Sequence, residues 1–149
     1  MIASGQTLKL LQPVQPFCER TKHNGMTYGV GPAGYDVRIA QTVDLEPNGF
    51  MLASTLEKFI MPNFLVGIVH DKSTLARLGI ALQNTVIEPG WSGFLTLEIT
   101  NHSKKRVIIT EGTPIAQIIF HMTDMHVENP YSGKYQNQQS GPVAAILEK

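Results

Sequence analysis

The sequence contains a single cysteine, Cys18, and no excess of charge of either sign. One cysteine cannot form an intramolecular disulfide, so the chain suits a reducing compartment and we expect it in the cytoplasm. Its 12 Lys+Arg residues balance its 12 Asp+Glu residues. This balance argues against nucleic acid or an anionic membrane as the main partner. No apolar run approaches the ~20 residues of a membrane-spanning helix, and the N-terminus lacks a signal-peptide pattern.

Ligands for a catalytic metal are also scarce. Zinc sites in enzymes are built from clustered Cys and His side chains, and His121 and His126 form the only close pair of such residues here. Their spacing does not place them on one face of a strand. The sequence therefore predicts no directly bound catalytic metal, and no zinc in particular.

The chain is rich in apolar residues and in turn formers. Hydrophobic residues make up 42% of the 149 residues, with 13 Gly and 9 Pro. A chain of this length forms about one domain with a core of its own, so we expect a single domain over residues 1–149. Short apolar runs between turns predict an all-β barrel or sandwich. The expected strands are Val37–Ile39, Phe50–Ala53, Leu65–Val69, Phe94–Thr100, Val107–Ile109 and Ile115–Phe120.

One segment favours a short helix instead. Ser73 is placed to cap its N-terminus and Gly79 to end it. Ser73 and Arg77 are four residues apart and so lie near one face. With Lys72 and Thr74, Ser73 forms a candidate anion site, although an ordinary cap beside an exposed lysine fits the same residues. Arg77 is either solvated or a cation that positions a carboxylate or phosphate.

Glu98 lies in the middle of an expected strand, between Leu97 and Ile99. Alternation places it on one face with Thr96 and Thr100, and places Leu95, Leu97 and Ile99 on the other. A solvent-facing carboxylate on an outer strand is one interpretation. The other is a carboxylate shielded from water, whose raised pKa suits proton transfer near neutral pH.

The two ends of the chain differ from its middle. Residues 129–142 are polar and rich in Gly and Gln, which is typical either of a frayed terminus or of a flap that orders over a polar ligand. Near the N-terminus, Leu8–Leu11 is interpreted as a first strand and residues 13–31 as a loop or an added arm. The single Trp91, in a turn between two strands, is expected to anchor packing.

Four segments, taken together and in order, resemble the dCTP deaminase family of the trimeric dUTPase superfamily. They are Asp71–Gly79, Ile87–Gly93, Thr96–Glu98 and Gly133–Gln139. The resemblance implies a distorted β-barrel or jelly roll with one short helix, assembled as a homotrimer with active sites between subunits. It also implies hydrolysis of dCTP to dUTP and ammonia without zinc, with Mg²⁺ entering on the nucleotide phosphates.

The resemblance gives the candidate residues their roles. Glu98 matches the base that activates water for attack on cytosine C4 and passes a proton to the leaving ammonia. Arg77 matches the residue that orients this Glu in a neighbouring subunit, and Ser73 matches one that contacts the water or the phosphates. Lys72, where the family usually has Arg, and Thr74 complete the phosphate site.

Further substrate contacts are implied by the same resemblance. Tyr131, Lys134 and Gln138 are expected to close over the triphosphate and the base, which makes residues 129–149 a lid. The expected contacts in the central loop and turn are Asn84, Thr85, Glu88 and Trp91. This loop is shorter than in the family, and Glu88 replaces an Asp that meets the deoxyribose 3′-hydroxyl.

Other functions remain open at this point. Gly34-Tyr35-Asp36 resembles the first dUTPase motif, so a bifunctional enzyme forming dUMP and pyrophosphate, or a plain dUTPase, is an alternative in which Glu88 acts on water at the α-phosphate. A nucleotide-binding regulator without turnover is another. However, the Gly-rich fifth dUTPase motif is absent, and dUTPases generally have an apolar residue where Glu98 stands. The deaminase interpretation is therefore favoured.

Overall fold

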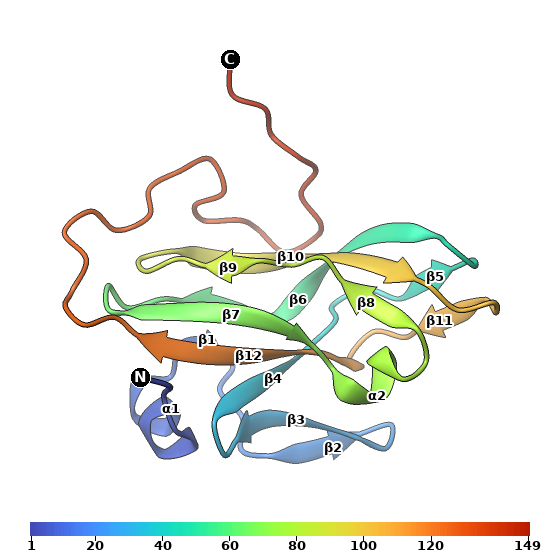
Figure 1. Cartoon of the computed structure of the whole chain (residues 1–149), viewed down its shortest axis with the longest axis horizontal. Helices are drawn as coiled ribbons and strands as arrows, with labels where there is room; N and C mark the ends of the chain where they lie inside the picture. The colour runs from blue at the N-terminus through green and yellow to red at the C-terminus, as the bar shows by residue number, and fades with distance from the viewer.

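The computed structural model describes all 149 residues, with two short helices and twelve strands (Figure 1). The helices are α1 (Gly5–Leu11) and α2 (Ser73–Ala76). The strands are β1 (Val14–Gln15), β2 (Thr21–His23), β3 (Met26–Gly31), β4 (Gly34–Arg38), β5 (Val43–Leu45), β6 (Phe50–Ile60), β7 (Leu65–Asp71), β8 (Ile80–Leu82), β9 (Val86–Ile87), β10 (Ser92–Asn101), β11 (Val107–Ile109) and β12 (Pro114–Met122). Neither helix is long and apolar enough to cross a membrane.

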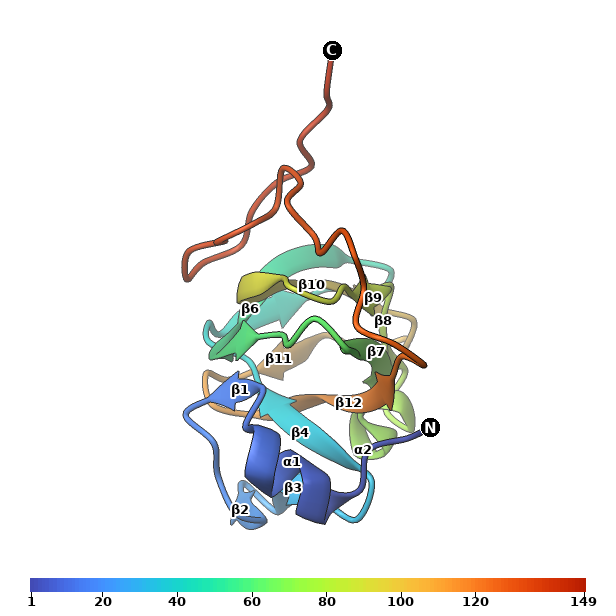
Figure 2. The same cartoon turned by 90° about the vertical axis from the view of Figure 1, so that its left-hand side faces the viewer.

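The strands form two larger sheets and one small pair, all antiparallel. The six-stranded sheet has the order β2-β3-β4-β12-β7-β9, the four-stranded sheet the order β1-β6-β10-β8, and β11 pairs with β5. In both views, β6 and β10 lie over β7, β12 and β4, so the larger sheets face one another (Figures 1 and 2). The predicted all-β class is confirmed.

A cluster of 24 buried hydrophobic residues fills the space between the sheets. Along β12, Ile118 and Phe120 are fully buried, whereas Gln117 and Ile119 are partly exposed. This alternation is that of a strand with one face on the core. In β10, Leu97 and Ile99 belong to the same cluster, as their spacing predicted.

The N-terminal segment departs from the predictions. The fold has two helices rather than one, because Leu8–Leu11 belongs to α1 and not to a strand. The Ser4 hydroxyl accepts a hydrogen bond from the N–H of Thr7 and caps the helix, and Gln12 ends it in a left-handed conformation. A run of four residues with three leucines fits a strand or a helix equally well, and the cap at Ser4 decides between them.

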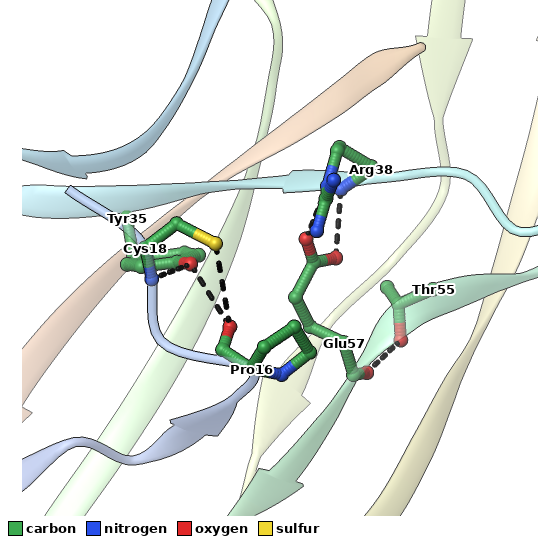
Figure 3. A network of polar contacts seen from close by, with 6 residues as sticks. All are labelled: Pro16, Cys18, Tyr35, Arg38, Thr55 and Glu57. Atoms are coloured by element: carbon green, nitrogen blue, oxygen red, sulfur yellow. Dashed lines mark hydrogen bonds and ion pairs between the residues drawn. The ribbon is translucent and has the colours of Figure 1, made fainter. Parts of the chain in front are cut away.

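Residues 13–31, expected to be a loop or an arm, contain β1, β2 and β3. The β2–β3 hairpin turns at Asn24 and Gly25, which both have positive φ, as the tightest hairpin turns require. The Tyr35 hydroxyl ties this segment to β4, accepting from the N–H of Cys18 at 2.9 Å and donating to the Pro16 carbonyl at 3.3 Å (Figure 3).

A buried ion pair joins β4 to β6. Glu57 is completely buried, and its carboxylate accepts hydrogen bonds from the backbone N and the Nε of Arg38 at 2.9 and 2.8 Å (Figure 3). Burial raises the pKa of Glu57, while Arg38 opposes that shift. The Arg38 guanidinium also lies over the Tyr28 ring, 4.2 Å from its centroid. The sequence analysis did not identify this pair, whose members come from strands distant in the chain.

The predicted short helix is confirmed as α2, a single turn that Gly79 follows with a φ of +85°. Ser73, however, is not its cap. Lys72 occupies the N-cap position without any side-chain capping bond, and Ser73 is the first helical residue. A lysine ammonium has no acceptor for the N–H groups of a helix, and that of Lys72 instead forms an ion pair with Asp36.

Candidate functional site

A cavity of about 440 Å³ opens beside the middle of β10. Its walls come from β10, the loop that follows β8 and the C-terminal segment, and most of the lining is apolar. Seven of the predicted site residues line it: Asn84, Thr85, Glu88, Trp91, Glu98, Tyr131 and Gln138. Concave, largely apolar sites with a few polar groups are where small ligands bind.

Glu98 of β10 lines this cavity with an ionisable side chain. It lies opposite Leu52 of β6, and its carbonyl accepts a hydrogen bond from the N–H of Gln83 at 2.9 Å. The residue is half-buried, and burial raises the pKa of its carboxyl. No basic side chain of the chain forms an ion pair with it, in contrast to Glu57. Burial therefore makes this carboxylate a stronger proton acceptor than an exposed glutamate.

An irregularity in β10 shapes the floor of the cavity. The register with β6 shifts between Phe94 and Thr96, so Leu95 leaves the regular ladder. Leu95 was expected on one face with Leu97; it packs partly against the core but also lines the cavity together with Thr96. A local break in pairing changes the face on which a side chain lies, and a strict period of two does not reveal it. Thr96 itself shares the predicted face of Glu98 and was identifiable from that pattern.

The loop after β8 is tied to β10 by side-chain hydrogen bonds. The Asn84 amide donates to the Thr96 carbonyl at 2.7 Å and accepts from the N–H of Glu98 at 3.1 Å. Thr85 and Glu88 are exposed. The Thr85 carbonyl accepts a hydrogen bond from the N–H of Val69, and the Glu88 carbonyl accepts one from the N–H of Trp91. Of these residues, Asn84 makes the contacts closest to Glu98.

Trp91 anchors packing, as predicted, and also holds the C-terminal segment. Its ring is buried against Phe59, with centroids 6.1 Å apart. Its Nε1 donates to the carbonyl of Tyr135 at 2.7 Å. Tyr135, which lines the cavity, was not among the predicted residues.

The C-terminal segment is paired along the start of β10 rather than frayed. The Gln136 side chain accepts from the N–H of Ser92 at 2.8 Å and donates to the Gly90 carbonyl at 2.9 Å. Gln138 forms a parallel bridge with Gly93, and its carbonyl accepts from the N–H of Phe94 at 3.0 Å. Figure 1 shows this segment returning over β10 before the chain ends.

The segment continues into the cavity beyond Gln138. The N–H of Gly141 donates to the Ser54 hydroxyl at 3.0 Å, and that of Val143 donates to the Thr96 hydroxyl at 3.1 Å. Ser54 and Thr96 are direct partners in the β6–β10 register, so their hydroxyls dock alternate residues of the segment. Val143 also lines the cavity. The sequence analysis gave no signal for this contact.

The remaining predicted residues lie elsewhere in the single chain. Ser73, Thr74 and Arg77 are exposed on and after α2, and none of them lines the cavity. An Arg77 guanidinium nitrogen donates only to the Ser73 carbonyl, at 3.3 Å. Lys134 is exposed over the Tyr135 ring, 5.4 Å from its centroid. One chain therefore holds Glu98 and Arg77 in separate places.

Lys72 is buried rather than presented to solvent. Its ammonium pairs with one carboxylate oxygen of Asp36 and donates to the Thr27 hydroxyl at 3.3 Å. The other Asp36 oxygen is buried without a hydrogen-bond partner. Within the chain, the Lys72 ammonium, which was predicted to bind phosphate, thus connects β4 to the start of α2.

No three His, Cys, Asp or Glu side chains of the chain gather where they could hold a metal ion. His126 instead packs against the Phe64 ring, with centroids 4.9 Å apart. The chain therefore has no cluster of these side chains that could bind a divalent cation directly.

Comparison with known proteins agrees with the resemblance found in the sequence. The family profile described as dCTP deaminase-like matches residues 35–123. The dCTP deaminase of Campylobacter fetus is 33% identical, and the match covers 91% of this chain and 91% of the relative. That of a Sulfurovum species is 34% identical, with 91% and 90% covered.

Solved structures show the same fold. A 2′-deoxycytidine 5′-triphosphate deaminase from Agrobacterium tumefaciens superimposes with a TM-score of 0.66 at 18% identity, covering 81% of this chain and 47% of that one. The EIAV dUTPase superimposes with a TM-score of 0.59 at 21% identity, covering 81% of this chain and 96% of that one. A dUTPase from phage phi11 of S. aureus, solved to show the coordination of a structural Mg(II) ion, gives 0.56 at 19% identity, with 80% and 90% covered.

Proposed function

Because the chain belongs to the dCTP deaminase-like family, we propose that it is an enzyme that hydrolyses dCTP to dUTP and ammonia. The observation that carries the proposal is Glu98, a half-buried carboxylate with a raised pKa in a mostly apolar cavity. The curated relatives named as dCTP deaminases support this reaction over the dUTPase alternatives. A free deoxynucleotide substrate also fits the expected place of action in the cytoplasm.

The chemistry requires one base that later acts as an acid. Glu98 takes a proton from water, and the hydroxide adds to cytosine C4. The carboxyl then returns the proton to the C4 amino group, the C–N bond breaks and ammonia leaves, while the proton of the added hydroxyl passes to N3 as the C4 carbonyl forms. A carboxyl whose pKa is raised by burial accepts a proton more readily than an exposed one and can then donate it. The sum is dCTP plus water giving dUTP plus ammonia, without a separate cofactor.

We infer that the working form is a homotrimer in which Arg77 and Ser73 of one subunit complete the cavity of another. This inference is supported by their exposed position away from the cavity and by the lack of a cation beside Glu98. Exposed apolar side chains suited to a subunit interface include Phe50, Ile60 and Leu78. A guanidinium brought to Glu98 would orient its carboxylate.

The substrate is expected as a complex of dCTP with Mg²⁺, the ion being held by the triphosphate. Lys134 and Thr74 carry exposed groups that suit phosphates. For Lys72 to do so, its ammonium must leave Asp36. Tyr131 and Gln138 belong to the segment that covers the cavity, so residues 129–149 are proposed to act as the lid.

Incubation of the purified protein with dCTP and Mg²⁺, followed by chromatography of the nucleotides, tests this function. We expect ammonia and dUTP to accumulate in equal amounts. The variant Glu98→Gln should release no ammonia while still binding dCTP, whereas Glu111→Gln, at an exposed turn before β12, should behave as wild type. Accumulation of dUMP would instead direct attention to Glu88, and an active Glu98→Gln enzyme would disprove the mechanism.

A further inference from the structure

The part of β10 that lines the cavity is paired with β6 on one edge but has no strand partner on the other, the β8 edge. On one edge, the ladder with β8 ends at the pair Ile99–Leu82, followed by a last backbone bond from Gln83 to Glu98. On the other edge, the register with β6 breaks between Phe94 and Thr96. On the β8 edge, the Thr96 carbonyl and the Glu98 N–H therefore depend on a group other than a strand for their hydrogen bonds.

On the β8 edge, this group is the side chain of Asn84. Its amide nitrogen donates to the Thr96 carbonyl at 2.7 Å, and its amide oxygen accepts from the N–H of Glu98 at 3.1 Å. A side-chain amide has one carbonyl and one N–H group in the arrangement of a peptide unit, so it can replace a strand partner. Asn84 thus extends the ladder beyond the last residue of β8, directly beside Glu98.

We propose, on the basis of the proposed deaminase function, that Asn84 is a positioning residue for Glu98 rather than a contact for the nucleotide. Both polar atoms of its side chain are directed to β10, although the residue lines the cavity. Its effect is to fix the Cα of Glu98, and with it the depth of the carboxylate in the cavity. Catalytic groups lose activity when displaced by about 1 Å, so this fixation bears on the chemical step.

The first test compares kcat and KM for dCTP. Asn84→Ala should lower kcat by roughly 10- to 100-fold and leave KM within about twofold, because only the base is displaced. The matched control is Asn101→Ala, at the other end of β10, whose amide donates to the carbonyls of Leu45 and Lys105. It should lower the melting temperature and keep the wild-type kcat. A rise in KM alone, or an unchanged kcat, in Asn84→Ala would overturn the proposal.

The second test does not depend on activity. Amide hydrogen exchange should become at least about tenfold faster at Glu98 in Asn84→Ala. The amide of Thr100, which lies within the ladder with β8, should keep its protection. Unchanged exchange at Glu98 would show that Asn84 does not hold it. If the wild-type protein releases no ammonia from dCTP, the proposed function fails, and the exchange measurement still decides whether Asn84 positions Glu98.

Discussion

At the scale of single residues, the carboxylates of Glu57 and Glu98 show how differently the same group can be used. Glu57 is fully buried and bound twice by Arg38, so its charge is balanced within the fold. Glu98 is half-buried beside apolar groups and has no cation of its own chain. An unbalanced, partly dehydrated charge is unfavourable for folding, and such groups are typical of functional sites.

The first prediction concerns the stability cost of Glu98. Burial raises the pKa of Glu98 in the folded state above its ordinary value in the unfolded state. Between these two pKa values the folded state binds more protons than the unfolded state. The free energy of unfolding therefore falls as the pH rises through that window. Glu98→Gln should therefore melt at a higher temperature than wild type at pH 8. Below about pH 4, where the carboxyl is protonated in both states, the difference should vanish.

Thermal melting monitored by circular dichroism at the two pH values measures this effect. Glu111→Gln serves as the control and should leave the melting temperature unchanged at both. A Glu98→Gln protein less stable than wild type at pH 8 would mean that the ionised carboxylate makes favourable contacts in the folded state, and would contradict the prediction.

At the scale of elements, the site depends on two departures from regular strand pairing. The break in the β6–β10 register frees the N–H of Leu95, which donates to the Thr55 hydroxyl at 3.0 Å. The same hydroxyl donates to the Glu57 carbonyl at 2.8 Å (Figure 3). A single buried side chain thus satisfies two backbone groups that have no ladder partner.

Thr55→Val should therefore destabilise the fold by about 1–3 kcal/mol, because it leaves both buried backbone groups unpaired while preserving the shape of the side chain. Thr55→Ser keeps the hydroxyl and should lose less. Urea denaturation of the two variants and of wild type gives the comparison. Equal stability of Thr55→Val and wild type would show that water or a shifted backbone replaces the hydroxyl.

The second departure is the close approach of the C-terminal segment to Gly93. This glycine has a φ of +148°, and a Cβ there would lie 2.7 Å from the backbone nitrogen of Gln138. Gly93→Ala should release the segment, raise KM for dCTP several-fold and make residues after 129 sensitive to protease. Gly31→Ala, where the nearest atom to a Cβ lies at 3.6 Å, is the control. A protease-resistant segment in Gly93→Ala would contradict this interpretation of the lid.

The sequence predicted the regular elements well and the irregular ones poorly, for physical reasons. The apolar runs of β7, β10 and β12 and the short helix α2 were identified because burial imposes a simple period. Glu98 could be singled out because a charge in such a run is unusual. The bulge at Leu95, the role of Asn84 and the docking of Val143 on Thr96 depend on which strand lies opposite, and no local pattern carries that information.

At the scale of the whole molecule, one chain brings only part of the predicted site together. Seven predicted residues share the cavity, while Arg77 and Ser73 lie outside it. A closed trimer would place three identical interfaces around an axis, each joining Glu98 of one subunit to Arg77 of the next. Three chains of 16.4 kDa give an assembly of about 49 kDa, which light scattering can measure.

Mixing two inactive variants tests the shared site directly. Glu98→Gln and Arg77→Ala should each lack activity alone. When the two variants are refolded together in equal amounts, about three quarters of the random trimers contain both. Each mixed trimer has one of its three interfaces with both native residues, so the mixture should recover about a quarter of wild-type activity. No recovery in confirmed mixed trimers would show that Glu98 and Arg77 act within the same subunit or not together.

The most direct test of the deaminase function is the fate of the water oxygen. The reaction with dCTP and Mg²⁺ is run in ¹⁸O-labelled water, and the product is analysed by mass spectrometry. We expect dUTP carrying one ¹⁸O in the base, with an unlabelled triphosphate, and no label incorporation by Glu98→Gln. Label in a phosphate group, or dUMP without labelled base, would contradict it and show that water attacks phosphorus instead of cytosine C4.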